Sequence, residues 1–198
     1  ITTFSIGADS YKCHTFTSSG TFTVAEGTRN IDILLVAGGG SGGGRHGGGG
    51  GSGGLVIKTA RSTGVGSYSI VIGAGAAAPS PVYAVGTNGS NSTAFGFTSV
   101  GGGGGGVYAA PAVQPNGLAG GSGGGGLGDT PNTAGGASTQ QSAGTPTDSP
   151  NNVTAYGNAG GVGYHGPNDA RMCGGGGGAG AVGGTGGVNT APYIGGAG

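Results

Sequence analysis

Charged residues are scarce in this sequence. Six of its 198 residues are basic and six are acidic, so the formal net charge at pH 7 is zero. The basic residues form no cluster along the chain; they are Lys12, Arg29, Arg45, Lys58, Arg61 and Arg171. Because nucleic acids and anionic membranes are bound through clustered lysine and arginine, we expect neither as a partner.

Long hydrophobic runs are missing as well. A membrane-spanning helix needs about 20 consecutive apolar residues, whereas the most apolar stretch, Ile31–Ala37, is far shorter. The chain opens on Ile1, without a Met or the basic segment that begins a signal peptide. We therefore expect no membrane insertion and no signal peptide, and we interpret the chain as a processed or excerpted segment.

Cysteine is limited to Cys13 and Cys173, near opposite ends of the chain. A disulfide between them would close a long loop and tie the first strands to the glycine-rich part. Two separate thiols are equally compatible with the sequence, so both alternatives stay open at this point.

Residues that could bind a metal or catalyse a reaction do not form a recognisable motif. The candidate zinc ligands are Cys13, His14, His46, His165 and Cys173. Only Cys13 and His14 are close in sequence, and adjacent residues of a strand point to opposite faces. The acidic residues form no catalytic pair; they are Asp9, Glu26, Asp32, Asp129, Asp148 and Asp169. We therefore expect no metal.

Nucleotide-binding motifs fail on their context. Gly73–Ala78 matches the pattern G-x-G-x-x-A after a strand-like run, but the dinucleotide motif must open a helix. Pro79 and Pro81 forbid a helix there. Neither lysine follows a glycine, so the sequence has no Walker motif. We therefore expect no cofactor and no enzymatic activity.

Glycine, by contrast, accounts for 58 of the 198 residues, roughly four times its usual share of ~7 %. A collagen triple helix is excluded, because runs such as Gly101–Gly106 and Leu55–Lys58 break a Gly-X-Y register. Disorder is the alternative, but the chain lacks the strong charge of many disordered proteins and carries clear strand patterns. We therefore expect glycine to be structural material.

The first hundred residues have the pattern of β-strands. β-Branched and aromatic runs bounded by Gly, Asn, Ser and Pro predict strands at Tyr11–Thr17, Gly20–Val24, Ile31–Ala37, Leu55–Thr59, Ser67–Ile72 and Thr93–Val100. No stretch has helical periodicity with caps. We predict an all-β protein with essentially no α-helix, in which residues 1–100 form a small β-sandwich with a glycine-rich insert at 38–54.

Several predicted strands run directly into glycine, as at Val100-Gly101. An extended chain without side chains favours polyproline-II-type geometry, with about 3 residues per turn and no internal hydrogen bonds. Packed helices of this type can bond to one another, provided that each face against a neighbour is glycine. We predict that residues 101–198 form a packed bundle of polyglycine-II helices with connecting loops. The scaffold is assigned to Gly101, Gly102, Gly103, Gly104, Gly105, Gly106, Gly174, Gly175, Gly176, Gly177 and Gly178.

The glycine runs of this second part alternate with varied segments that suit turns at the ends of the bundle. Any recognition of a ligand is expected in these loops, where tyrosine supplies rigid surface and Gln and Asn supply amide hydrogen bonds. The candidate receptor-binding residues are Tyr108, Gln114, Asn116, Gln140, Gln141, Tyr156, Tyr164, His165 and Arg171.

The ordered series of motifs resembles the glycine-rich domain of bacteriophage tail and tail-fibre proteins. The resemblance runs through Tyr11–Gly40, Gly53–Ile57, Tyr68–Gly75, Asn88–Gly96, Gly101–Gly106 and, more loosely, Ala191–Gly196. The glycine-rich half is also similar in composition to the polyglycine-II fibre-tip adhesins of T-even-like phages. The phage domain usually continues after a motif like Tyr193–Gly196 with more glycine and an apolar strand, whereas this chain stops at Gly198. We expect either a truncated segment or a strand supplied by a neighbouring subunit.

The resemblance implies a non-enzymatic component of the virion surface, with an extracellular location. Its expected role is that of a receptor-binding adhesin, which displays loops to a bacterial cell-surface glycan or protein. The alternative is a structural subunit of an extracellular filament, sheath or capsid layer. Both roles imply assembly with other virion or filament subunits, as a homo-oligomer. An antifreeze role would need regularly spaced threonines, which the sequence lacks.

Overall fold

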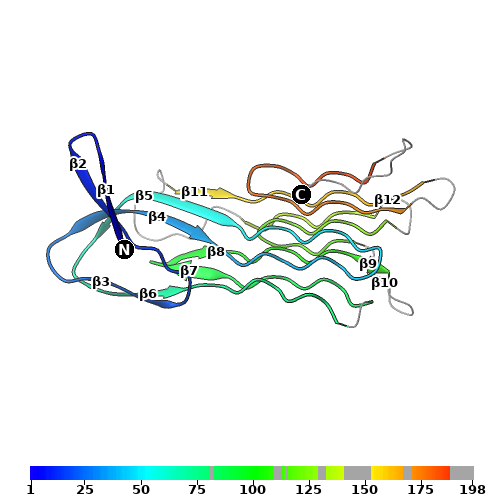
Figure 1. The fold of residues 1–198 in the computed structure, drawn as a ribbon, viewed down its shortest axis with the longest axis horizontal. Coiled ribbons are helices and arrows are strands. Elements are labelled where there is room, and N and C mark those ends of the chain that lie inside the picture. The colour runs from blue at the N-terminus through cyan, green and yellow to red at the C-terminus, as the bar shows by residue number, and fades with distance from the viewer. Residues whose placement is uncertain are drawn as a thin grey trace.

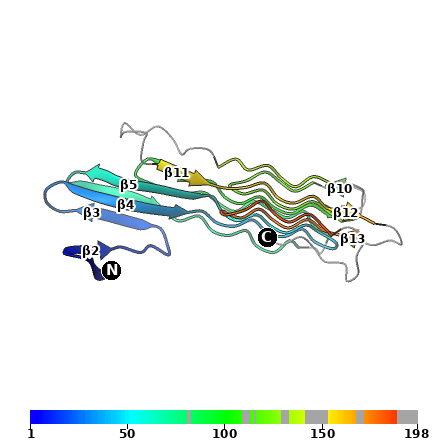
Figure 2. The same ribbon diagram turned by 90° about the horizontal axis from the view of Figure 1, so that it is seen from above.

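The chain forms an elongated, all-β molecule (Figure 1). The computed structural model describes residues 1–80, 83–108, 113–114, 116–128, 133–140, 153–166 and 171–187. Within these ranges there are strands, turns and extended segments but no helix. The strands of the first hundred residues gather at one end of the molecule, which we call the strand end. From there the glycine-rich segments run side by side to the opposite end (Figures 1 and 2).

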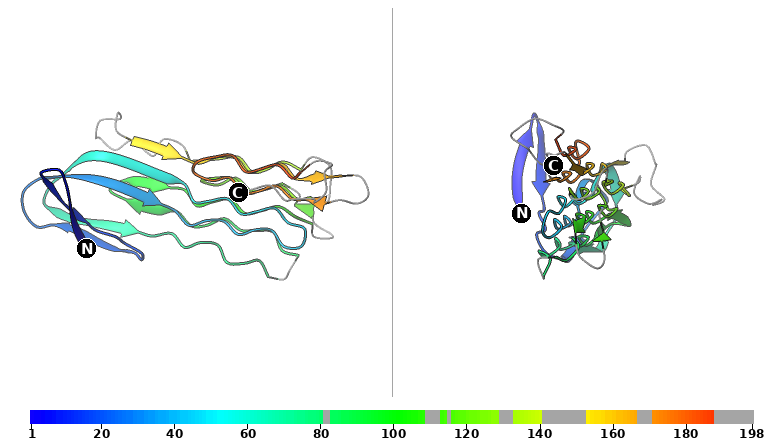
Figure 3. Two further views of the ribbon diagram at one scale, coloured as in Figure 1. Left: turned by 45° about the horizontal axis from the view of Figure 1, so that its top comes forward. Right: turned by 90° about the vertical axis from the view of Figure 1, so that its right-hand side faces the viewer.

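Eight strands come from the first hundred residues, in the region where the sequence predicts β-structure. They are β1 (Thr2–Ile6), β2 (Asp9–Cys13), β3 (Gly20–Val24), β4 (Arg29–Val36), β5 (Leu55–Thr63), β6 (Gly66–Val71), β7 (Ser92–Ala94) and β8 (Phe97–Ser99). β1 and β2 pair only with each other and form a hairpin to one side of the strand end (Figure 3). Every residue of this hairpin is exposed.

Two larger antiparallel sheets contribute to one apolar core. Their strand orders are β11-β5-β4 and β3-β6-β7-β8. The buried side chains are Ile33, Leu35 and Val56 from the first sheet and Ile70, Ala94 and Phe97 from the second. Strand β11 (Val153–Tyr156) pairs with β5, so a segment from the second half of the chain completes a sheet of the strand end.

The run Thr93–Val100, predicted as a single strand, is instead the hairpin of β7 and β8. Phe95 and Gly96 form its turn, with positive φ angles of 53° and 83°. Two successive residues with positive φ give a turn whose twist matches that of antiparallel strands. The prediction missed this turn because an aromatic residue rarely adopts positive φ.

Beyond the strands, the chain continues in extended glycine-rich segments that are joined through their backbones. In the view along the long axis of the molecule, these segments form a bundle rather than a single layer (Figure 3). Their hydrogen bonds recur at every third residue. The N–H groups of Gly48, Gly51 and Gly54, for example, donate to the carbonyls of Gly106, Gly103 and Val100 at 2.9, 2.8 and 2.8 Å. The insert at 38–54 is thus bonded to the run that follows β8.

Every backbone polar group of Gly101–Gly106 is hydrogen-bonded. The six N–H groups, in order, donate to Asn91 Oδ1, Gly38 O, Ser122 O, Asn88 Oδ1, Ser41 O and Gly125 O. The six carbonyls, in order, accept from the N–H groups of Gly121, Gly89, Gly51, Leu118, Gly86 and Gly48. Buried backbone groups must find partners, and this run finds them on all sides without belonging to a sheet.

The distance between segments leaves no room for side chains at the inner positions. A Cβ atom added at Gly103 would overlap the carbonyl of Leu118, and one added at Gly124 would overlap the carbonyl of Gly104. At Gly180, on the surface, an added Cβ would meet nothing within 4 Å. Glycine is therefore required where segments face one another, and dispensable where they face solvent.

Candidate functional site at the distal tip

The glycine-rich segments end in turns and short strands at the end of the molecule opposite the sheets (Figures 1 and 2). We call this region the distal tip. It comprises the turn 44–47, Tyr83, and the strands β9 (Val107–Tyr108), β10 (Val113–Gln114), β12 (Tyr164–His165) and β13 (Arg171–Met172). β9 pairs with β10 and β12 pairs with β13, both antiparallel.

Three apolar side chains anchor the distal tip. Val107 and Leu127 are fully buried, and Met172 is 2 % exposed. Each stands close to the end of a glycine run, so the buried side chains begin where the glycine runs stop. Thr133 Oγ1 donates to the carbonyl of Leu127, which connects this anchor to the next segment.

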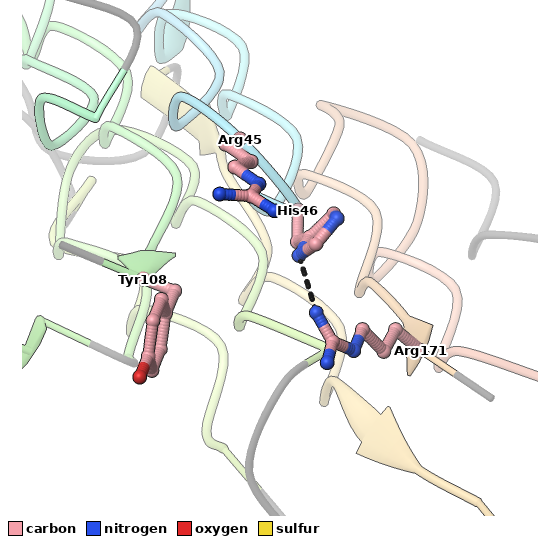
Figure 4. A pocket seen from close by; sticks show the side chains of 4 residues that line it. All are labelled: Arg45, His46, Tyr108 and Arg171. Atoms are coloured by element: carbon pink, nitrogen blue, oxygen red, sulfur yellow. Dashed lines mark hydrogen bonds between the residues drawn. The ribbon is translucent and has the colours of Figure 1, made fainter. Parts of the chain in front are cut away.

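A small cavity of about 300 Å³ opens at the distal tip and is lined by Arg45, His46, Tyr108 and Arg171 (Figure 4). The Arg171 guanidinium Nη1 lies 3.0 Å from His46 Nδ1. A guanidinium can only donate hydrogen bonds, so Nδ1 is the acceptor. Arg45 Nη1 donates to Tyr83 Oη at 3.2 Å, and its guanidinium lies 5.6 Å from the centre of the Tyr83 ring.

The backbone of His46 is held in an uncommon conformation at this turn. Its φ angle is +51°, a value that few residues other than glycine adopt. The carbonyl of His46 accepts a hydrogen bond from Cys173 Sγ at 3.0 Å. Contacts from a segment more than a hundred residues away in sequence thus fix both the backbone and the ring of His46.

The predicted receptor-binding residues divide between the two ends of the molecule. Tyr108, Tyr164, His165 and Arg171 lie at the distal tip, and the backbone of Gln114 lies there in β10. Tyr156 is on β11 at the strand end. Gln140 accepts a hydrogen bond from the N–H of Val100 through Oε1 at 2.8 Å, beside β8. Asn116 accepts one from the N–H of Ala134 at 3.0 Å. Gln141 lies outside the described residues.

Sequence reasoning missed three residues of this site. The sequence places Arg45 among basic residues that form no cluster and His46 among candidate zinc ligands that form no motif, and it assigns no role to Tyr83. The sequence did contain a signal, because Arg45-His46 is the only interruption between Gly42 and Gly51. Two large side chains within such a run cannot be packed between backbones, so they indicate that the chain leaves the packed segments and turns there. Two basic residues that are far apart in sequence, Arg45 and Arg171, line the same cavity here.

Of the two alternatives for Cys13 and Cys173, the structure has the one without a disulfide between them. Cys13 ends β2 at the strand end, whereas Cys173 directly follows β13 at the distal tip (Figure 2). The two thiols are kept apart by the length of the glycine-rich segments, so no rearrangement of side chains could bring them together.

The described part of the chain lacks two kinds of feature. There, no three side chains among His, Cys, Asp and Glu come close enough to share a metal ion. The same residues contain no helix of sufficient length and hydrophobicity to cross a membrane.

The fold defines an all-β protein with glycine as its main building material. A family model described as a glycine-rich domain matches residues 15–198, so the chain belongs to this glycine-rich domain family. The hairpin of β1 and β2 precedes the matched region. No curated protein and no solved structure shows significant similarity to the chain.

Proposed function

We propose that this protein is a non-enzymatic, receptor-binding adhesin on the surface of a phage particle, similar to the tail-fibre proteins that its motifs resemble. The glycine-rich segments would be its scaffold and the distal tip its contact surface. The observation that carries the proposal is the meeting of Arg45, His46, Tyr108 and Arg171 at the far end of a long, backbone-bonded scaffold. Receptors are commonly recognised by variable side chains on a rigid framework.

The finer architecture forms part of this proposal. The segments are interpreted as polyglycine-II helices and the two larger sheets as a small β-sandwich. The support is that the hydrogen-bond partners of Gly101–Gly106 repeat with a period of three residues. The N–H groups of residues 102 and 105 donate to the carbonyls of residues 38 and 41, and those of residues 103 and 106 donate to the carbonyls of residues 122 and 125. The N–H groups of residues 101 and 104 donate to the side chains of Asn91 and Asn88. A helix of about three residues per turn presents three such faces.

Binding to whole bacteria tests the adhesin role. The fluorescently labelled protein is mixed with a broad panel of Gram-negative and Gram-positive strains, and bound fluorescence is measured by flow cytometry. Two variants are compared: Tyr108→Ala with Tyr164→Ala at the distal tip, and Leu34→Ser with Val36→Ser on the exposed side of β4. The second pair is the control for surface changes far from the tip.

We expect the natural protein and the β4 control to bind a subset of strains. Binding of the distal-tip variant should be reduced at least roughly tenfold, because aromatic residues often contribute most of the binding energy of an interface. Equal binding by the distal-tip variant would contradict the assignment of the contact surface. Absence of binding to every strain would contradict the adhesin role itself.

A structural subunit is the second candidate function, and the surface of the strand end favours it. Leu34 and Val36 on β4 are 66 % and 51 % exposed, and Ile6 of the N-terminal hairpin is 64 % exposed. Exposed apolar side chains on unpaired strand edges are typical of surfaces that join subunits. Electron microscopy of the purified protein discriminates: continuous filaments would support the structural role, and separate short particles would support the adhesin.

A further inference from the structure

The cavity at the distal tip offers an unusual combination of side chains for so weakly charged a protein. Two of its six basic residues and one of its three histidines line a space of about 300 Å³. Arg45 and His46 come from the turn 44–47, Tyr108 from β9 and Arg171 from β13, so three separate segments converge on it (Figure 4). A volume of this size lies at the lower end of the range for small-molecule sites.

The polar groups around this cavity are mainly hydrogen-bond donors. A guanidinium carries five N–H donors and no acceptor, and Arg45 and Arg171 both line the cavity. Since His46 Nδ1 accepts from Arg171, the neutral ring carries its proton on Nε2 and adds another donor. Such a set fits a ligand rich in acceptor oxygens, and a negatively charged one in particular.

Charge is distributed unevenly over the described part of the molecule. The described carboxylate residues are Asp9, Glu26 and Asp32, and all three lie in or between strands of the strand end. The other three acidic residues, Asp129, Asp148 and Asp169, lie outside the described residues. Among the described residues, the wall of the cavity thus contains two cationic side chains and no carboxylate, a combination that attracts anionic ligands.

Tyr108 supplies the remaining wall. Its side chain is 41 % exposed and lies across the cavity from the basic group (Figure 4). An exposed aromatic ring beside charged hydrogen-bond donors can cover the apolar face of a sugar ring while the donors hold its polar substituents. Neither feature alone would specify a sugar, but together they suit one that carries an acidic group.

We propose that the distal-tip cavity binds the carboxylate of an acidic sugar, such as a uronic acid residue within a bacterial surface polysaccharide. This inference rests on the proposed adhesin function and names its ligand class. Arg45 and Arg171 bind the carboxylate, for which the planar guanidinium is geometrically matched. His46 positions Arg171 through the Nδ1 hydrogen bond, and Tyr108 packs against the sugar ring.

The test measures binding of defined oligosaccharides by isothermal titration calorimetry at low and high salt. Three probes are used: an oligogalacturonate, the same oligosaccharide with its carboxyl groups reduced to alcohols, and a phosphorylated neutral oligosaccharide. The variants are Arg45→Ala, Arg171→Ala and, as a matched control with the same change of charge, Arg29→Ala at the strand end. Circular dichroism and the midpoint of thermal unfolding show whether each variant is folded.

We expect the natural protein to bind the oligogalacturonate, and to bind its reduced form at least roughly tenfold more weakly, since hydrogen bonds between charged groups are stronger than those between neutral ones. Arg45→Ala and Arg171→Ala should each cause a similar loss, while Arg29→Ala should cause none. The comparison of the acidic and the reduced probe needs no variant, so it decides the matter even if a substitution prevents folding.

Equal affinity for the acidic and reduced probes, or no affinity for either, would overturn the inference. Binding of the phosphorylated probe alone would overturn the carboxylate assignment, and unchanged binding by both arginine variants would overturn the location. These failures are distinguishable from failure of the adhesin role, because binding to whole bacteria is measured separately. A protein that binds cells but no acidic sugar retains the proposed function and lacks the proposed ligand.

Discussion

The two ends of this molecule are stabilised by different interactions. At the strand end, apolar side chains such as Val56 and Phe97 are buried in a core to which two sheets contribute. In the glycine-rich segments there are almost no side chains to bury, and neighbouring backbones are joined directly by N–H···O bonds of 2.6–3.2 Å. The first arrangement depends mainly on the removal of apolar surface from water, and the second on the number and geometry of hydrogen bonds.

This difference determines how each end responds to substitution. A net contribution of about 0.5–1.5 kcal/mol per hydrogen bond must offset the large conformational entropy that glycine loses on ordering. The glycine-rich part therefore needs nearly all of its bonds, as Gly101–Gly106 illustrates. The core of the strand end can lose a methyl group and relax, whereas a segment packed against backbone on three sides cannot move aside.

The largest effect is expected in the side-chain core. Phe97→Ala should lower the free energy of unfolding by about 3–5 kcal/mol, because it removes a fully buried ring and leaves a cavity. Phe4→Ala, in the exposed N-terminal hairpin, is the matched control and should change stability little. Urea unfolding followed by circular dichroism measures both. Similar losses for the two variants would show that burial does not govern the stability of this end.

The next effect concerns the packed glycines. Gly124→Ala should lower the free energy of unfolding by about 2–3 kcal/mol, since its methyl group would overlap the Gly104 carbonyl and overpacking is costly. Gly180→Ala, with open space around it, should stay within about 0.5 kcal/mol of the natural protein. Amide hydrogen exchange should be slow along Gly101–Gly106 in the natural protein and faster in Gly124→Ala. A tolerated Gly124→Ala would refute the close packing of these segments.

The smallest effect is expected where a side chain substitutes for backbone. Asn88 Oδ1 accepts from the N–H of Gly104 at 3.0 Å, and its Nδ2 donates to the carbonyl of Ala119 at 2.8 Å. Asn88→Ala should lower the free energy of unfolding by about 1–2 kcal/mol, because both backbone groups lose their partners. Asn30→Ala, at an exposed position of β4, should have little effect. Equal stability of these two variants would exclude a structural role for the Asn88 amide.

The strand pattern of the first hundred residues could be predicted because alternation and β-branched residues are local properties of the sequence. Four short strands beyond residue 106 could not, since β9, β10, β12 and β13 contain two residues each. The turn at Phe95-Gly96 was missed for a related reason. Its positive φ angles are imposed by the pairing of β7 with β8, and the sequence Phe-Gly does not by itself favour them.

The candidate site was predicted in part. Tyr108 and Arg171 were identified as exposed residues of varied segments, and both line the cavity. Their partners Arg45 and His46 lie in a glycine-rich stretch of the first hundred residues, outside the loops in which recognition was predicted. Only the length of the segments brings the turn 44–47 to the same end as β9 and β13 (Figure 4). The pattern of residues along the chain does not show which turns lie next to one another in the folded protein.

The sequence by itself determined the all-β class, the absence of helix in the described residues, and the need for glycine wherever backbone meets backbone. These properties follow from local periodicity and from the size of a side chain, which each residue carries with it. The tertiary structure decided which segments bond to which, that Cys13 and Cys173 lie at opposite ends, and that two arginines and a histidine share one cavity. These features depend on distances between residues remote in sequence, which are set only when the segments pack.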